Sequence, residues 1–512
     1  TSATDSKGAG SNDKGNQGQY GLGISGDVSL NRINDNTRAI INDAGTFKAD
    51  QIALSASNDT EVLAVAGAVF VSSEAKSIGL AGSWSEITLT GTTEAWINAA
   101  TLQQVNGLNI TANRTGDIFS ITAGGSGAPA KGSVTVAGSV SINRIANSTT
   151  ASLDDVNGTI NGDIVLSASD GSELSAIAGA VSFGGKAGIG AAVALNSINN
   201  ATAATISGSI LSQTGLLTLE AVSDATIESI TSSAGLSQNN AGVAGTVSIN
   251  EISNTVEASV TATQQAAGVP LSAGAISLSA RDGTTIRAIS GAVGVSKNIG
   301  FGAAVSYNAV NNTVSAHVDS SSIDTTGSLS LAAESTSLIE TITVGVAGGK
   351  SLGLSGSVSL NSITNTVDAY IGNNADIEAS DVSLSASDTS TVKVIAGGVA
   401  IASSAAIGAA VAINDVDNTI TASVDAATVT TTGALSLSAT SDAGLDTLAV
   451  GGAVSGTFAG AGSVSLNDIA NTVEASITGG ATVDADSMSL AATDTSTIEA
   501  LAGGVAGAGS VA

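Results

Sequence analysis

The sequence predicts an all-β protein: an elongated β-solenoid, expected to be a right-handed β-helix, built from about nine tandem repeats of ~53 residues. Three observations predict this fold. One motif recurs along nearly the whole chain, apolar and polar residues alternate within it, and aromatic residues make up only 2% of the composition. A repeat that cannot bury its own apolar face must stack on its neighbours, so the chain is expected to form one array.

The motif is clearest in VSLNDIANTVEASI, residues 464–477. Each copy contains an anchoring residue, and successive anchors lie 53 to 58 residues apart. The anchors are Asn31, Ile87 in a degenerate copy, Asn143, Asn196, Asn250, Asn308, Asn361, Asn414 and Asn467. An alanine stands eight residues after every anchor, as Ala475 does after Asn467. This regularity predicts that equivalent residues stack at one position of each coil.

Period-two alternation indicates the strands. After the anchor Asn467, Val473, Ala475 and Ile477 alternate with polar residues, and the later LSLSA segment of each repeat alternates in the same way. This pattern is typical of strands with one buried face, and clusters such as TGG and SDAG predict turns between them. A repeat with some five short strands suits two coils of about 25 to 28 residues. We therefore expect roughly 19 coils, spaced ~4.8 Å apart, in a rod on the order of 90 Å long.

The repeats also define the domain organisation. Residues 26–512 are expected to form one continuous solenoid array, and residues 1–25 a partial repeat or a flexible polar start. A chain of immunoglobulin-like sandwiches is the alternative. Such domains run to ~100 residues with aromatic core anchors, which neither the period nor the composition matches. Because the chain begins without a methionine, we expect it to be a piece of a longer or processed protein.

Composition excludes several functions. The formal net charge is -28 with only 15 Lys and Arg residues, which argues against nucleic-acid binding and against an anionic membrane surface. The absence of cysteine removes disulfides and thiolate metal sites, and a single histidine leaves little zinc chemistry. Acidic, cysteine-free, Gly-rich repeats predict a chain that is exported and folds outside the cell.

One apolar run, Val394 to Ile413, is long enough to resemble a membrane span. Sister repeats carry a lysine in the same region: Lys76, Lys131, Lys186, Lys297 and Lys350. A position that accepts lysine in five copies is expected to be a solvated turn. The run is therefore predicted to be two strands joined through Ser403 and Ser404, without membrane insertion.

Two columns of asparagine are the strongest candidate site. The anchors form the first, and a second follows four residues later: Asn147, Asn200, Asn254, Asn312, Asn365, Asn418 and Asn471. Stacked amides can hydrogen-bond from coil to coil and satisfy buried backbone groups at a bend. The favoured interpretation is thus a structural ladder of Asn31, Asn143, Asn196, Asn250, Asn308, Asn361, Asn414 and Asn467. Ligand recognition by surface amides is the alternative.

Aspartates recur after the LSLSA strand, and the favoured interpretation is that they form turns through their side-chain bonds to the backbone. Calcium binding is the alternative, and its candidates are Asp170, Asp224, Asp282, Asp388, Asp442 and Asp494. Calcium requires several oxygen ligands at one point, whereas each predicted turn offers one carboxylate. We therefore expect no cofactor beyond weakly bound surface calcium.

No residue pattern predicts catalysis. His317, the one histidine, lies on the polar face of its repeat and is expected to be solvated. No catalytic triad can be assembled around it. The segment Gly21 to Gly26 spells GxGxxG, but it precedes a strand and not a helix, so it fails as a dinucleotide motif. The sequence predicts a protein that is not an enzyme.

The repeats GSVSLNDIANTVEASI and LSLSATSDA resemble those of giant repetitive bacterial surface proteins, the filamentous-haemagglutinin-like and autotransporter-type adhesins. The resemblance implies secretion, a β-solenoid shaft, and a role in adhesion or matrix formation. We therefore expect an extracellular structural or adhesive protein that forms the shaft of a surface fibre. The alternatives are a self-polymerising filament or sheath subunit and a glycan- or ice-binding solenoid. Expected partners are further copies or neighbouring repeats of a longer chain, and a glycan or protein receptor on a host or cell surface.

Overall fold

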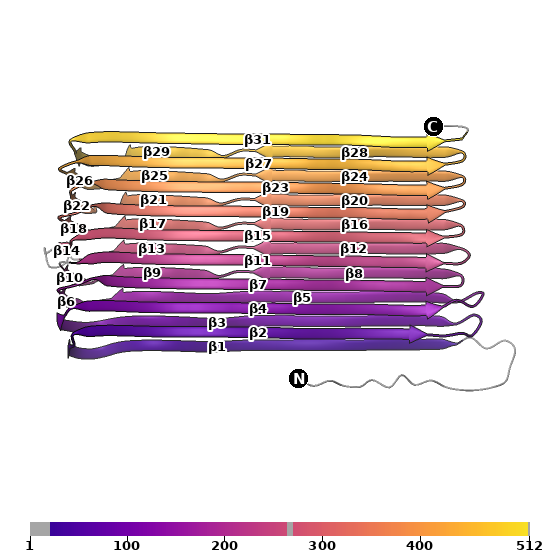
Figure 1. Ribbon diagram of the computed structural model, residues 1–512, viewed down its shortest axis with the longest axis horizontal. Helices are drawn as coiled ribbons and strands as arrows, with labels where there is room; N and C mark the ends of the chain where they lie inside the picture. Colours follow the sequence, from indigo (N-terminus) through magenta and orange to yellow (C-terminus); the bar gives the residue numbers. More distant parts are fainter. Residues whose placement is uncertain (1–20, 214, 264–269, 510–512) are drawn as a thin grey trace.

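The computed structural model describes residues 21–213, 215–263 and 270–509, and these residues are β-strands joined by short turns. The strands form two parallel sheets, one of nine strands and one of 22 (Figure 1). We call them the continuous sheet and the segmented sheet. Parallel strands need crossover connections, and here each crossover is a strand of the opposite sheet. The chain thus winds as a β-solenoid, as predicted.

The continuous sheet takes one strand of 21 or 22 residues from each repeat. Its strands are β2 (Gln51–Val71), β4 (Gly107–Ala128), β7 (Ile164–Gly184), β11 (Leu216–Ser237), β15 (Ala275–Ser296), β19 (Leu329–Gly349), β23 (Val382–Ala402), β27 (Ala434–Ser455) and β31 (Ser487–Ala508). Each begins in the LSLSA segment. The SDAG cluster lies inside β27, so the turn predicted there is wrong.

The segmented sheet takes one to three strands from each repeat, and from β5 onward none is longer than 21 residues. The first repeats supply β1 (Leu22–Lys48), β3 (Ile78–Val105), β5 (Val134–Asp154) and β6 (Asn157–Ile160). The later repeats supply β8 (Ala187–Ile198), β9 (Ala201–Ser207), β10 (Ile210–Gln213), β12 (Ala241–Ile252), β13 (Thr255–Thr261), β14 (Leu271–Ala273), β16 (Ile299–Val310), β17 (Thr313–Asp319), β18 (Ser322–Thr325), β20 (Leu352–Ile363), β21 (Thr366–Gly372), β22 (Asp376–Ala379), β24 (Ala405–Val416), β25 (Thr419–Asp425), β26 (Thr428–Thr431), β28 (Phe458–Ile469), β29 (Thr472–Thr478) and β30 (Thr482–Asp484).

Each repeat makes one coil, and the prediction of two coils is wrong. The register shows this directly, because Asn196 of β8 pairs with Asn250 of β12, one full repeat later. The nine strands of the continuous sheet therefore stack over roughly 40 Å, about half the predicted rod. Strands of 21 residues extend roughly 70 Å across the stack. The coil is thus broad and flat, and its longest dimension lies along the strands (Figure 1).

Part of the predicted organisation lies outside the described residues. These parts include residues 1–20 of the predicted polar start and residues 264–269 of the predicted array. The strand β1 begins at Leu22, four residues before the predicted start of the array. The apolar run forms β23 and β24, joined through Ser403 and Ser404, as predicted. No helix long and apolar enough to span a membrane occurs among the described residues.

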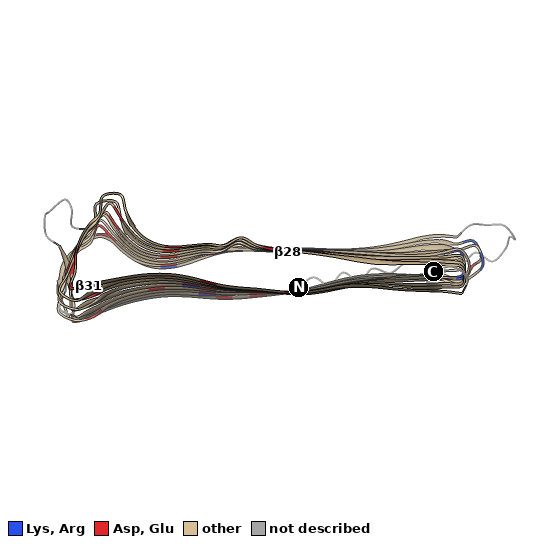
Figure 2. Ribbon diagram, turned by 90° about the horizontal axis from the view of Figure 1, so that it is seen from above, with Lys and Arg blue, Asp and Glu red and all other residues tan. Residues whose placement is uncertain are grey.

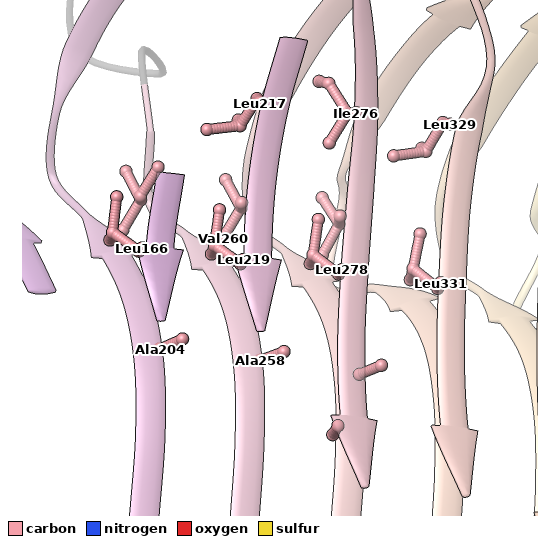
Figure 3. Packing of buried hydrophobic residues seen from close by; sticks show 14 of the residues in the cluster. Leu166, Ala204, Leu217, Leu219, Ala258, Val260, Ile276, Leu278, Leu329 and Leu331 are labelled. Carbon is pink, nitrogen blue, oxygen red and sulfur yellow. The ribbon is translucent and has the colours of Figure 1, made fainter. Parts of the chain in front are cut away.

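The interior differs between the two ends of the coil. At one end the layers lie far apart (Figure 2), and Leu, Ile, Val and Ala fill the space between them. Like side chains repeat there along the stack, as Leu166, Leu219, Leu278 and Leu331 do (Figure 3). Over the other half the layers lie close together (Figure 2). A Cβ added at Gly398 would collide with the Ala409 carbonyl oxygen, so inward residues there are small. Phe70 of β2 lies inward only opposite Gly23 and Gly79.

Both ends of the flat coil are closed by turns. The turns at the thin end carry the predicted solvated lysines, seen in blue at that end in Figure 2. At the wide end, one corner residue in each repeat has a positive φ. These residues are Asp43, Ala99, Asp155, Gly208, Ala262, Ser320, Asn373, Ala426 and Gly479. The corner is thus a left-handed position that most repeats fill without glycine.

Candidate functional site: two polar columns inside the coil

The anchoring asparagines form a hydrogen-bonded column that runs along the stack. Asn143 Nδ2 donates to Asn196 Oδ1 at 2.9 Å, and the same bond joins every later pair up to Asn467 at 2.8 Å. The side chains point inward because each anchor is an inward position of an alternating strand. Stacking in register places each amide about one strand spacing, ~4.8 Å, from the next. One primary amide can therefore donate to one neighbour and accept from the other.

Hydroxyl groups of the continuous sheet meet this column from the opposite layer. Asn308 Nδ2 also donates to Thr341 Oγ1 at 2.8 Å, and Asn414 Nδ2 donates to Thr447 Oγ1 at 2.7 Å. Thr341 in turn donates to Asn361 Oδ1 at 3.0 Å. The column thus ties the two layers together as well as the successive coils.

The first coil departs from this arrangement. Asn31 pairs in register with Ile87, and Ile87 with Asn143, so the degenerate copy separates Asn31 from the column. Asn31 Nδ2 donates to Ser29 Oγ at 3.0 Å in its own strand. Ile87 is buried in an apolar cluster.

The second asparagine column caps a break in the segmented sheet. Between β8 and β9 the ladder stops, and the Asn200 backbone N–H instead donates to Asn254 Oδ1 of the next coil at 3.2 Å. The same bond joins Asn312 to Asn365 at 3.2 Å and Asn365 to Asn418 at 2.8 Å. An unpaired buried N–H is costly, so asparagine compensates for the break.

A column of alternating aspartate and serine faces the second asparagine column across the interior. Its residues are paired in register on the continuous sheet: Asp170, Ser223, Asp282, Ser335, Asp388, Ser441 and Asp494. Asp170, Asp282 and Asp388 are buried. A carboxylate in every second coil lies about two strand spacings, ~10 Å, from the next, which limits their mutual repulsion.

Asp282 and Asp388 each join asparagines of two coils, and Asp170 accepts from Asn200 Nδ2 at 2.7 Å. Asp282 accepts from Asn254 Nδ2 at 3.0 Å and from Asn312 Nδ2 at 2.7 Å, and Thr284 Oγ1 donates to it at 2.7 Å. Asp388 accepts in the same way from Asn365 at 2.9 Å and from Asn418 at 2.8 Å. Donors thus meet acceptors around Asp282 and Asp388, whereas the side-chain amide of Asn147 has no hydrogen-bond partner among the described residues.

Burial controls the protonation of these carboxyl groups. Burial raises the pKa of Asp282 to about 7, although hydrogen bonds from Thr284 and Asn254 oppose the shift. Burial also raises the pKa of Asp170 and of Asp388, again against hydrogen bonds from nearby side chains. The loss of hydration outweighs the donors because the groups lie between two packed sheets.

The structure divides the six predicted calcium candidates into two sets. Asp170, Asp282, Asp388 and Asp494 belong to the inward column, whereas Asp224 and Asp442 point outward and are exposed. The prediction that these residues form turns is wrong, because Asp170 and its equivalents lie within continuous strands. Across the described residues, no group of three or more His, Cys, Asp or Glu side chains is arranged to hold a metal ion.

Arg114 is a buried charge that the sequence reasoning missed. It occupies the column position between Asn58 and Asp170, and its guanidinium contacts Asp35 at 2.9 Å. Burial alone would raise the pKa of Asp35, but hydrogen bonds from Arg114, Asn58 and Thr60 hold it below its usual value. Arg114 thus takes the place that an aspartate has in later coils, because here the carboxylate, Asp35, belongs to the opposite sheet.

His317 is not solvated, contrary to the prediction. Its ring stacks on Tyr370 of the next coil, with centroids 4.7 Å apart, and its Nδ1 lies 3.0 Å from Ser315 Oγ. Burial lowers the pKa of His317, while Glu257 and Asp319 oppose that shift. Outward position alone therefore did not decide exposure, because a large neighbour covers the ring.

The sequence did contain a signal for the aspartate column. Inward and outward residues alternate, and the alanine of the LSLSA segment points inward. Asp282 stands two residues after Ala280 and shares its face, whereas Asp224 stands three residues after Ala221 and takes the opposite one. An aspartate an even number of residues after that alanine points inward, and one an odd number of residues after it points outward.

Comparison of the chain with protein-family models, curated proteins and solved structures gives no match. The architecture itself defines the class: an all-β, β-solenoid-like protein in which repeated polar columns run along the interior.

Proposed function

We propose that this chain is a non-enzymatic structural protein, the shaft of a bacterial surface fibre or adhesin. In this proposal it forms a right-handed β-helix of about nine ~53-residue repeats within a longer shaft. One observation carries the proposal: the asparagine column passes unbroken from Asn143 to Asn467 and binds each coil to the next. A ligand site would need one distinct place, whereas this arrangement repeats in every coil from Asn143 to Asn467.

The arrangement suits a load-bearing shaft. Backbone hydrogen bonds of both sheets run along the stack, and the two asparagine columns add side-chain bonds in the same direction. Separating two coils therefore requires breaking many bonds together. The net charge of -28 would keep such a shaft soluble and extended.

The location and partners of the protein are part of the same proposal. We propose that the chain is secreted and lies at the cell surface, where it continues into further repeats and meets a glycan or protein receptor. It would carry no resident cofactor, and any calcium would bind weakly at exposed carboxylates such as Asp224 and Asp442.

A second candidate function is self-assembly into a filament or sheath. It is favoured by a different observation, the large aliphatic side chains exposed on the outer face of the continuous sheet. A glycan- or ice-binding solenoid, by contrast, has no specific support from the geometry.

Immunogold electron microscopy of cells that produce the parent protein tests the main proposal. Antibodies against this segment should label intact cells along extended surface structures, and cells lacking the gene provide the control. Labelling confined to the cytoplasm of sectioned cells would refute a surface shaft. Electron microscopy of the purified chain, with and without calcium, would then separate single bodies from filaments.

A further inference from the structure

The outer face of the continuous sheet carries aliphatic side chains over the thin half of the coil. We call this surface the aliphatic face: the outward residues of each long strand from the column that contains Ile342 to the turn. Ile289, Ile342 and Ile395 lie in one column of this face and are 47%, 40% and 45% exposed. Leu501 continues that column and is 65% exposed.

The thin interior explains why these side chains point outward. Behind this face, the inward positions from β4 onward hold glycine, alanine, serine and threonine, and a Cβ at Gly345 would collide with the Gly356 carbonyl oxygen. Phe70 of β2 is the exception, and it lies against Gly23 and Gly79. The large residues of these strands therefore have no interior space. A parallel sheet normally has both faces covered, so an exposed aliphatic face of this size is unusual.

The relief of the face is regular. Next to the isoleucine column, glycine and valine alternate from coil to coil as Gly291, Val344, Gly397, Val450 and Gly503. Projections and gaps thus alternate at the strand spacing of ~4.8 Å. Another sheet with the same spacing can match this relief, whereas disordered acyl chains gain nothing from its period. This favours a second copy of the chain over a lipid surface.

From β11 onward, one column of charged residues lines a border of the face, and most of its members are acidic. Arg287 bonds to Glu228 at 3.4 Å and to Glu340 at 3.2 Å, and Lys393 lies 3.7 Å from Glu340. A shallow groove of about 810 Å³ lies between this ladder and the isoleucine column. Only Arg287 and Lys393 offset these carboxylates, so this border repels a second copy until salt screens the charge.

The size of the face fits a stable interface. Seven residues along each strand and nine stacked strands give a footprint of about 1,000 Å² per copy. A standard interface covers about 800 Å² per partner. One face can therefore supply a full interface with a self-complementary partner.

We propose that two copies of this chain pack through the aliphatic face of the continuous sheet, about a two-fold axis. Such a contact is isologous, because the same columns meet on both sides. The inference rests on the proposed structural function and names the surface through which shafts associate laterally. It uses neither end of the stack, so it differs from end-to-end growth.

Sedimentation velocity of the purified chain tests the interface. The chain mass is 49.0 kDa, so the wild type should sediment as a species of about 98 kDa, twice the chain mass. Because each copy carries a net charge of -28, screening should strengthen the dimer as salt rises. A double variant, Ile342→Lys with Ile395→Lys, should be monomeric, with dimerisation weakened at least ~10-fold.

A matched control keeps this test specific. Thr336 and Thr389 lie on the same strands, face outward and are exposed, but lie outside the aliphatic face. Thr336→Lys with Thr389→Lys makes the same charge change and should dimerise like the wild type, and circular dichroism should show both variants folded.

Three results would overturn the proposal: a wild-type monomer at all concentrations and salt levels, equal dissociation of both double variants, or a monomer that floats with neutral phosphatidylcholine vesicles. The last would assign the face to lipid. None of them would alter the immunogold result, so the shaft proposal stands or falls separately.

Discussion

The buried carboxyl group of Asp282 predicts that the protein is more stable in mild acid than above neutral pH. Its pKa is about 7 in the folded chain and near 3.8, its ordinary value, in the unfolded one. Between these values the folded state binds the extra proton, so the free energy of unfolding falls as pH rises from about 4 to 7. A difference of about three pKa units corresponds to about 4 kcal/mol.

The matched variant is Asp282→Ser, because serine occupies the same column in both neighbouring coils, at Ser223 and Ser335. Urea unfolding followed by circular dichroism at pH 4.5, 6 and 8 gives the free energy of unfolding of each protein. The substitution loses hydrogen bonds to Asn254 and Asn312 at every pH, which adds a constant cost. Its stability relative to the wild type should nevertheless improve by about 3 kcal/mol between pH 4.5 and pH 8, since part of the effect is already present at pH 4.5.

The control is Asp442→Ser, which removes an exposed carboxylate from the outer face of β27 and should keep the wild-type pH dependence. A constant difference between Asp282→Ser and the wild type across this pH range would refute the reasoning. It would mean that the donors around Asp282 outweigh its burial and keep the group ionised.

Three further substitutions test other parts of the coil by urea unfolding. Asn361→Ala leaves neighbouring buried amides without partners and should lower the free energy of unfolding by about 2 to 4 kcal/mol. The control Asn31→Ala lies outside the column and should cost less than half as much. Equal losses of stability in the two variants would contradict the ladder. Ala426 has a φ of 49°, a left-handed conformation that glycine adopts without strain. Ala426→Gly should therefore raise the free energy of unfolding by about 0.5 to 1 kcal/mol, and a loss of stability would contradict this reasoning. Gly398→Val places a side chain against the Ala409 carbonyl oxygen, forces the two layers apart and should lower the free energy of unfolding by about 3 kcal/mol. An unchanged urea midpoint would show that the layers can separate there at little energetic cost.

The sequence by itself determined the class of fold and the internal column of anchors. The recurrence of one motif around Asn196, Asn250 and Asn308 required equivalent residues to stack, and the alternation around them required strands with one inward face. Local rules of this kind can be read from a sequence because they depend only on period and on side-chain type.

Only the tertiary structure decided how many coils each repeat makes. A break between two strands, as at Asn199 and Asn200, looks the same in sequence whether the chain reverses direction or continues within one layer. Here the chain continues in the same layer, because the side chain of Asn254 accepts a hydrogen bond from the backbone N–H of Asn200. Conversely, the SDAG cluster continues as a strand in β27, since pairing with two neighbouring strands outweighs local turn preference.

The tertiary structure also decided which residues are buried. Asp282 and Asp224 have the same type and nearly the same place in the repeat, but one residue of phase puts the first inside and the second outside. The outward Ile342 is exposed although it is aliphatic, because the two layers approach too closely for a large side chain between them. The distance between the two layers depends on all the side chains of the coil, so it cannot be predicted from a local sequence pattern.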